Sequence, residues 1–183
     1  IVRYMEKSTG NVFAVDPKNL FEERITNTTL PGSFKTIWHK NADDFVFQYL
    51  NENNVIKTRI NKIDSLGTTT ADGVYEVLGD FLEDNIIDLT TNKSHTNFVY
   101  TRPQQIGVVG VVHDFQDGVD LFSSDFSEWI LDWDSDLHIT TKASYAAQGF
   151  VYSIDIESGV LKKVFGDRNG FTTKQNSVGD ILF

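Results

Sequence analysis

Apolar and polar residues alternate along much of this chain with a period of two residues. That period is typical of β-strands that bury one face. The clearest case predicts a hairpin over 150–165, with the turn at Glu157, Ser158 and Gly159. Glycine in this turn can take the positive φ that tight hairpins need. The pattern therefore favours a chain built mainly from paired strands.

Other segments repeat this arrangement of apolar arm, Asp- or Asn-rich turn and apolar return. They predict hairpins over 11–25, 45–60 and 106–122, turning at 16–19, 51–54 and 116–118. The first arm of the last of these, 106–112, is nearly all apolar, as in a strand covered on both faces. A further strand is predicted over 137–147, where small and apolar residues alternate with polar ones.

Two segments show the spacing of helices instead. In 73–84 the apolar residues recur on one helical face, and Asp72 is suited to cap the first turn. We therefore expect one short amphipathic helix there. Asp125 and Glu128 have the spacing of a capping box, which predicts a short helical turn over 126–131.

These elements predict a mainly β fold, a β-sandwich or barrel of hairpins with the short amphipathic helix packed on it. With no linker or break in composition, we expect a single β-rich domain over 1–183. Evenly repeated hairpins would instead indicate β-propeller blades. Corresponding positions are unevenly spaced, however, at Phe13, Phe47, Val112 and Tyr152. We therefore favour the sandwich or barrel.

Composition narrows the possible partners. Aromatic residues make up 13% of the chain, which suits large rings packed on pleated sheets. A formal net charge of −10 repels phosphate, so we expect neither sequence-specific nucleic-acid binding nor a membrane partner. With no cysteine, disulfides and thiolate chemistry are excluded.

An acidic run offers weak metal ligands. Asp132, Asp134 and Asp136 alternate, and Ca²⁺ takes several carboxylate oxygens from one loop. The match to a calcium loop fails, because Leu137 stands where the sharp turn needs glycine and Ala143 stands where the bidentate glutamate should be. We expect a solvated acidic turn and no metal or other cofactor.

The motifs of common enzymes are missing. The sequence has no GxSxG elbow, P-loop, dinucleotide glycine fingerprint or HExxH pair. His113 and Asp114 are adjacent, but neighbours on a strand face opposite ways, so they do not predict a catalytic pair. We predict no catalytic residues and no enzyme, although two of the 26 acidic residues could still meet as a hydrolase pair.

Large aromatic side chains are the candidates for binding. A tryptophan or tyrosine exposed on a sheet can stack on a sugar or anchor a protein partner. The residues we expect at such an interface are Trp129, Trp133, Tyr145 and Tyr152.

The run Leu131-Asp132-Trp133-Asp134-Ser135, followed by Ile139 and Thr141, resembles the tail-tube proteins of contractile-tailed bacteriophages. In that family the run leads into an alternating strand, as we predict here. The resemblance covers 131–141. It implies a β-barrel or sandwich with a flanking helix, hexameric rings stacked into a tube that conducts DNA, and a virion location.

Together these observations predict a non-enzymatic structural or assembly protein, a component of a phage tail or other particle that acts through protein-protein interfaces. Its partners would be copies of itself or other virion proteins. A carbohydrate- or ligand-binding β-module is the first alternative, using tryptophan and tyrosine platforms with Asp or Asn hydrogen bonds. An acidic-site hydrolase is the second.

Overall fold

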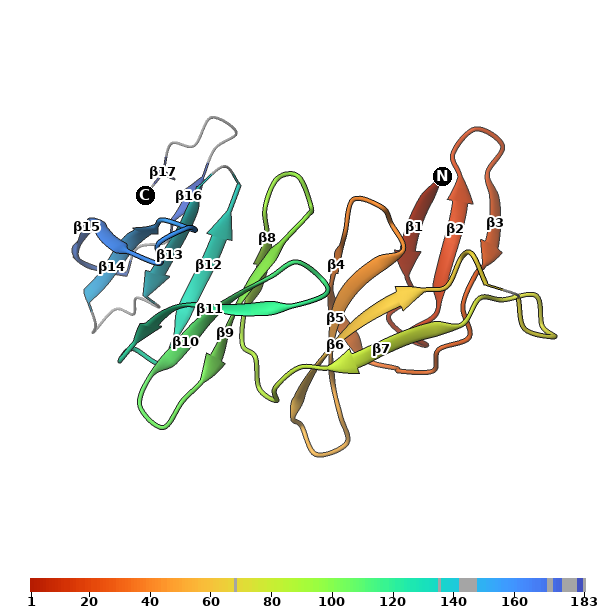
Figure 1. Ribbon diagram of the computed structural model, residues 1–183, viewed down its shortest axis with the longest axis horizontal. Helices are drawn as coiled ribbons and strands as arrows, with labels where there is room; N and C mark the ends of the chain where they lie inside the picture. Colours follow the sequence, from red (N-terminus) through yellow and green to blue (C-terminus); the bar gives the residue numbers. More distant parts are fainter. Residues whose placement is uncertain (68, 135, 142–147, 171–172, 176–180, 183) are drawn as a thin grey trace. The chain divides into compact units, whose positions relative to one another are not determined.

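A computed structural model describes residues 1–183 except 68, 135, 142–147, 171–172, 176–180 and 183. The described part contains seventeen strands and no helix (Figure 1). The prediction of a mainly β chain is therefore confirmed. The described residues form two compact units, Ile1–Asn85 and Ile86–Phe183, and each is treated by itself below. The single domain stays a prediction.

The first unit holds two antiparallel sheets whose strands follow one another in chain order. The three-stranded sheet contains β1 (Val2–Met5), β2 (Val12–Asp16) and β3 (Phe21–Arg24). The four-stranded sheet contains β4 (Ser33–Trp38), β5 (Asp44–Leu50), β6 (Ile56–Ile63) and β7 (Val77–Phe81).

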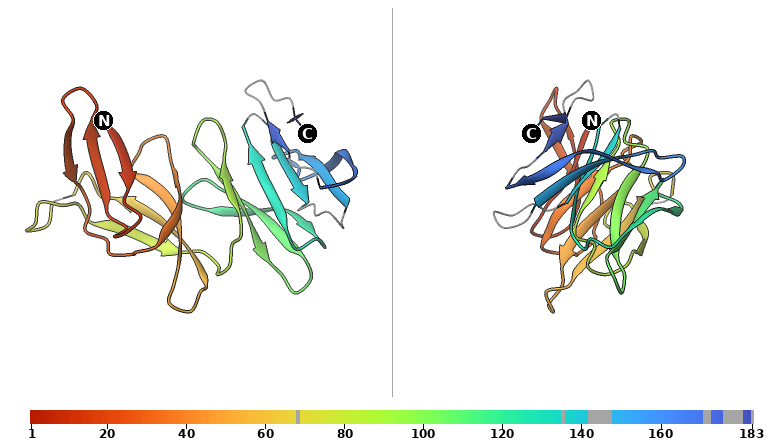
Figure 2. Two further views of the ribbon diagram at one scale, coloured as in Figure 1. Left: turned by 180° about the vertical axis from the view of Figure 1, so that it is seen from behind. Right: turned by 90° about the vertical axis from the view of Figure 1, so that its left-hand side faces the viewer.

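The second unit repeats this plan. One four-stranded sheet contains β8 (Leu89–Thr91), β9 (Phe98–Pro103), β10 (Val108–His113) and β11 (Gly118–Ser124). The next contains β12 (Trp129–Trp133), β13 (Leu137–Thr141), β14 (Gln148–Ile154) and β15 (Leu161–Asn169). A two-stranded ribbon, β16 (Lys174–Gln175) and β17 (Ile181–Leu182), follows. Figure 2 shows each sheet as an up-and-down ribbon of neighbouring strands.

Each predicted hairpin corresponds to a consecutive strand pair: 11–25 to β2 and β3, 45–60 to β5 and β6, 106–122 to β10 and β11, and 150–165 to β14 and β15. The strand predicted over 137–147 contains β13, and its second half lies outside the described residues.

The first strand of each four-stranded sheet is more buried than the last strand. The first strands β4, β8 and β12 each carry buried residues, whereas the last strands β7, β11 and β15 are mostly exposed. β3 is exposed at every position, so it matches the last strands. In the second unit β12 lies against β8 and β16, so the first strands of successive sheets are neighbours.

Hydrophobic side chains hold neighbouring sheets together within each unit. In the first unit Val12 of β2 packs in one cluster with Phe45 and Phe47 of β5. In the second unit Val99 and Phe122 share a cluster with residues of the next sheet, namely Trp129, Leu131, Trp133, Leu137, Ile139 and Ile154. Burying each such side chain contributes about 1.5–3 kcal/mol, so these clusters are the main stabilising contacts between sheets.

The helix predicted over 73–84 is wrong: 77–81 form the edge strand β7. Gly79 pairs with Asn61 of β6, and a Cβ on Gly79 would stand 2.1 Å from the carbonyl oxygen of Ile60. Glycine lowers helix stability by about 1 kcal/mol relative to alanine and here permits the close approach of β6. Pairing with β6 therefore makes this segment a strand, although its apolar residues have the spacing of a helix.

The helical turn predicted over 126–131 is also wrong. Trp129, Ile130 and Leu131 belong to β12, which pairs in register with β13. Burial alternates along this strand, with Trp129 and Leu131 buried and Ile130 exposed. The capping-box spacing of Asp125 and Glu128 fits a short connection as well as it fits a helix.

Gly107 is a position where only glycine fits. Its φ is +73°, and a Cβ there would stand 1.8 Å from the carbonyl oxygen of Ser124. Gly73 has nearly the same φ, +75°, but has no atom within 4 Å of a built Cβ. A substitution at Gly73 therefore tests backbone strain alone, whereas one at Gly107 tests strain together with a steric clash.

We predict that Gly107→Ala lowers the free energy of unfolding by about 3 kcal/mol or more, because left-handed strain of about 1–2 kcal/mol adds to an overpacking cost. Gly73→Ala should cost only the strain. Urea denaturation followed by circular dichroism measures both values. Equal losses in the two variants would contradict the clash.

Candidate functional site

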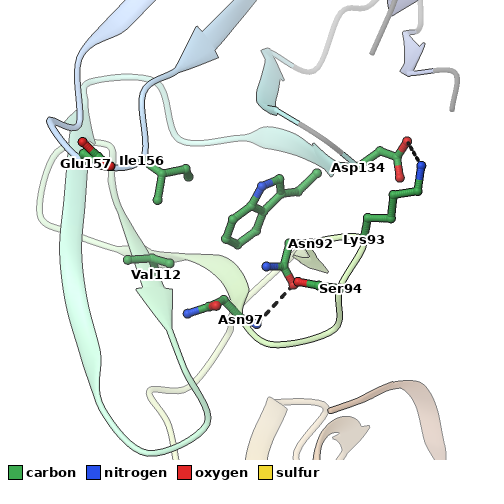
Figure 3. Close-up of a pocket in the computed structure, with 9 residues that line it drawn as sticks. Asn92, Lys93, Ser94, Asn97, Val112, Asp134, Ile156 and Glu157 are labelled. Atoms are coloured by element: carbon green, nitrogen blue, oxygen red, sulfur yellow. Dashed lines mark hydrogen bonds and ion pairs between the residues drawn. The ribbon is translucent and has the colours of Figure 1, made fainter. Parts of the chain in front are cut away.

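A groove of about 590 Å³ opens in the second unit (Figure 3). It is formed by the turn from β8 to β9, the ends of β10 and β12, and the turn from β14 to β15. Nine residues line it: Asn92, Lys93, Ser94, Asn97, Val112, Trp133, Asp134, Ile156 and Glu157.

Asn92 fixes the shape of the first turn. Its Oδ1 accepts hydrogen bonds from the backbone N–H groups of Thr96 (2.9 Å) and Asn97 (3.2 Å). Its Nδ2 donates to Thr96 Oγ1 at 2.9 Å. Asparagine favours turns because its side chain can replace backbone partners in this way. The turn is therefore held by its own side chain, and the groups it presents to the groove are pre-positioned.

Two contacts attach this turn to the end of β12. The backbone N–H of Lys93 donates to the carbonyl oxygen of Asp134 at 3.1 Å. The Lys93 ammonium lies 4.0 Å from Asp134 Oδ2, and the Lys93 side chain is 62% exposed. At such exposure the ion pair adds little to stability. Both side chains remain partly accessible from solvent.

The apolar part of the groove comes from three strands or their ends. Val112 lies on β10, Trp133 ends β12, and Ile156 follows β14. Val112 and Ile156 are partly buried against the core cluster that contains Trp133. Figure 3 shows Val112 and Ile156 on one side of the groove and Asn92, Lys93 and Asp134 on the other. The apolar side chains thus lie on one side, with Glu157 beside Ile156, and the other side is polar.

Asp155 shapes the turn that brings Glu157 to the groove. The backbone N–H and the hydroxyl of Ser158 both donate to Asp155 Oδ1 at 2.8 Å, and the N–H of Glu157 donates to it at 3.1 Å. These bonds favour the ionised carboxylate, so the pKa of Asp155 lies below its usual value of 3.8, chiefly through the Ser158 N–H. Glu157 itself is exposed on the rim.

The aromatic residues that we predicted as binding candidates lie in different surroundings. Trp129 is 4% exposed and packs edge-on against Phe122, Phe126 and Tyr152. Trp133 is nearly as buried but lines the groove. Tyr145 lies outside the described residues. Of the three candidates that the structure describes, Trp133 is therefore the one that lines this groove.

The three aspartates of the acidic run do not converge. Asp132 lies within β12, opposite His138 of β13, whereas Asp134 is beside Lys93 and Asp136 is exposed. Among the described residues, no three His, Cys, Asp or Glu side chains are grouped as a metal ion would need. Asp134 thus belongs to the polar wall of the groove.

His113 and Asp114 have structural partners. His113 is buried, stacks on Phe98 with ring centroids 4.9 Å apart, and accepts the N–H of Phe115 at 3.0 Å. Asp114 Oδ1 accepts the N–H groups of Asp117 and Gln116, which hold its pKa below the usual range. Both residues therefore stabilise the turn between β10 and β11.

The sequence pointed to Trp133 and Asp134 but missed Asn92, Lys93 and Asn97. The segment 92–97 is uniformly polar, which indicates only a turn. Its partners lie about forty and sixty residues further along, so strand pairing had to be known first. An asparagine at each end of the turn was the one usable signal.

No family model matches this sequence, and no curated protein matches it either. A crystal structure from Bacteroides fragilis NCTC 9343, provisionally named as a 6-phosphogluconolactonase, aligns with a TM-score of 0.45 and 8% identity. The alignment covers 84% of this chain and 46% of the other. A likeness of this size assigns neither a family nor an activity. None of the described residues forms a helix that could cross a membrane.

We predict that Asn92→Ala lowers the free energy of unfolding by about 1–3 kcal/mol, because two backbone N–H groups lose their acceptor. Ser94→Ala is the control, since its side chain makes one exposed contact and should cost under about 0.5 kcal/mol. Thermal or urea unfolding measures both. Similar values for the two variants would show that the Asn92 bonds do not hold the turn.

Asp155 should make stability depend on acid pH. Its pKa is lowered by folding, so its contribution is complete above about 3.8 and is lost as pH falls through the lower folded value. We therefore expect Asp155→Asn to reduce the melting temperature at pH 6 but much less at pH 2.5. Asp16→Asn, at the end of β2, is the comparison variant. A deficit that is unchanged at pH 2.5 would contradict the role of the charge.

Proposed function

We propose that this chain is a non-enzymatic assembly protein that joins other β-sheet chains through the free edge of β1. The first support is the order of the sheets. Each is an up-and-down ribbon, and the exposed last strand of one sheet leads to the first strand of the next.

The observation that carries the proposal is the unpaired edge of β1 in the β1-β2-β3 sheet. β3 precedes β4 as β7 precedes β8, and its exposure matches that of a fourth strand. Among the described residues, no strand pairs with the edge of β1 that faces away from β2.

That edge has backbone groups ready for pairing. Glu6 donates its N–H to Asn11 across the hairpin, and alternation therefore turns the N–H and C=O groups of Arg3 and Met5 away from β2. An unpaired row of this kind is a template for a strand from another chain.

Side chains distinguish this edge from β3 and β15. β3 carries Glu22, Glu23 and Arg24, and β15 carries Lys162 and Lys163. Charges of this kind protect edge strands from pairing. On β1, Val2 and Tyr4 are exposed apolar residues, while the one charged residue, Arg3, turns to a salt bridge with Asp43. β1 is therefore the less protected edge.

The proposed partner is a second copy of the chain or another component of the same particle. Burial of apolar side chains beside backbone pairing is the interaction that would hold such a contact. A phage virion is the setting that the sequence resemblance suggests, and it remains a prediction. Recovery of the protein from purified particles is the measurement that checks it.

We predict that the chain self-associates and that Val2→Lys raises the dissociation constant about tenfold or more, equivalent to at least ~1.4 kcal/mol. A lysine on the edge strand would place a charge at the new pairing surface. Val119→Lys is the matched control, because Val119 is an exposed valine on β11. Size-exclusion chromatography with light scattering measures all three proteins.

A monomeric mass at high protein concentration would contradict the predicted self-association. Equal weakening by Val2→Lys and Val119→Lys would show that the association does not use β1. Circular dichroism of both variants establishes that the fold is intact, since both valines are more than half exposed.

A further inference from the structure

The groove at the β8-β9 turn has a composition that the assembly role does not need. Its volume of about 590 Å³ lies within the range of small-molecule sites, 300–1,000 Å³. It combines one apolar wall with fixed polar groups from three separate turns or strand ends. Such a combination selects ligands that have both apolar and hydrogen-bonding surfaces.

The polar side chains of the groove disfavour two classes of ligand, anions and wholly apolar molecules. The ionisable side chains around the groove are Lys93, Asp134 and Glu157, with a formal sum of minus one, so an anion such as phosphate is repelled. A wholly apolar ligand would remove water from these groups and from Asn97 without replacing their hydrogen bonds, which is costly. A neutral ligand rich in hydroxyl groups is not repelled by the negative charge, and it can replace the hydrogen bonds that these groups make with water.

The polar groups offer donors and acceptors in fixed positions. The Nδ2 of Asn97 has no hydrogen-bond partner among the described residues, although its Oδ1 accepts from Thr96. Lys93 supplies donors, while Asp134 and Glu157 supply acceptors. A sugar hydroxyl is both donor and acceptor, so each of these groups can bond it without a change of charge.

We propose that this groove binds a neutral saccharide, whose C–H face lies on Val112, Ile156 and the part of Trp133 that lines the groove. Its hydroxyl groups then bond Asn97, Lys93, Asp134 and Glu157. The exposed Lys93 and Glu157 side chains lie on opposite sides of the groove, where the site is open to solvent. Longer glycans can therefore extend beyond the bound unit.

Saturation-transfer NMR tests the proposal with the methyl glycosides of glucose, galactose, mannose and N-acetylglucosamine as probes. A glycan array extends the same test to oligosaccharides. We expect saturation transfer to at least one probe, strongest at its ring C–H protons. No transfer from any probe together with no array binding would overturn the proposal.

Variants locate the binding. Lys93→Met keeps the apolar stem but removes a charged donor, so the dissociation constant of the best probe should rise about 10-fold or more. Glu157→Gln should weaken binding by a smaller factor. Lys162→Met is the control, because Lys162 is exposed on β15 and does not line the groove. It should leave the constant unchanged within about twofold.

Binding that is unchanged in both groove variants would place the sugar elsewhere and overturn the assignment. Displacement of the sugar by millimolar inorganic phosphate would identify an anion site and would also overturn it. The Val2→Lys variant should bind the sugar normally, so failure here and failure of the assembly role are distinguishable.

Discussion

Within each unit, neighbouring sheets bury one another's apolar side chains, and this burial organises the rest of the structure. Val12 and Ala14 of the first sheet are buried by packing with Phe45 and Phe47 of the next. In the second unit, Val99 and Phe122 are covered in the same way by β12 and β13. A four-stranded ribbon alone would leave such residues in water, so successive sheets stabilise one another.

Polar contacts then fix how two sheets of the second unit meet. Asp88 Oδ2 accepts the N–H of Leu131 at 3.0 Å near the start of β8, while Lys93 donates its N–H to Asp134 beyond the other end of that strand. Hydrophobic burial is non-directional, but these bonds specify the register of β8 against β12. They also place the Asn92 turn against the end of β12, which creates the polar wall of the groove.

The hairpins could be predicted because their signals are local. Alternation over 150–165 and the turn at Glu157-Ser158-Gly159 lie in one short segment. The first strands could not be predicted in this way. β8, for example, has only three residues and packs against β12, which lies much further along the sequence. The false helix over 73–84 arose from the same cause: its apolar spacing was visible, whereas the partner strand β6 was not. Uneven connections also hid the repeat of successive sheets.

The two proposed surfaces depend on opposite physical features. The edge of β1 is adhesive because its backbone groups are unpaired and its exposed side chains include Val2 and Tyr4, which carry no charge. The groove is selective because Asn92 holds its turn rigidly, so a ligand need not order it on binding. Strand pairing uses backbone hydrogen bonds and so depends little on the partner's sequence. Donors and acceptors in fixed positions discriminate between stereoisomers of a ligand. A protein with both could join a large assembly through one unit and recognise a glycan through the other.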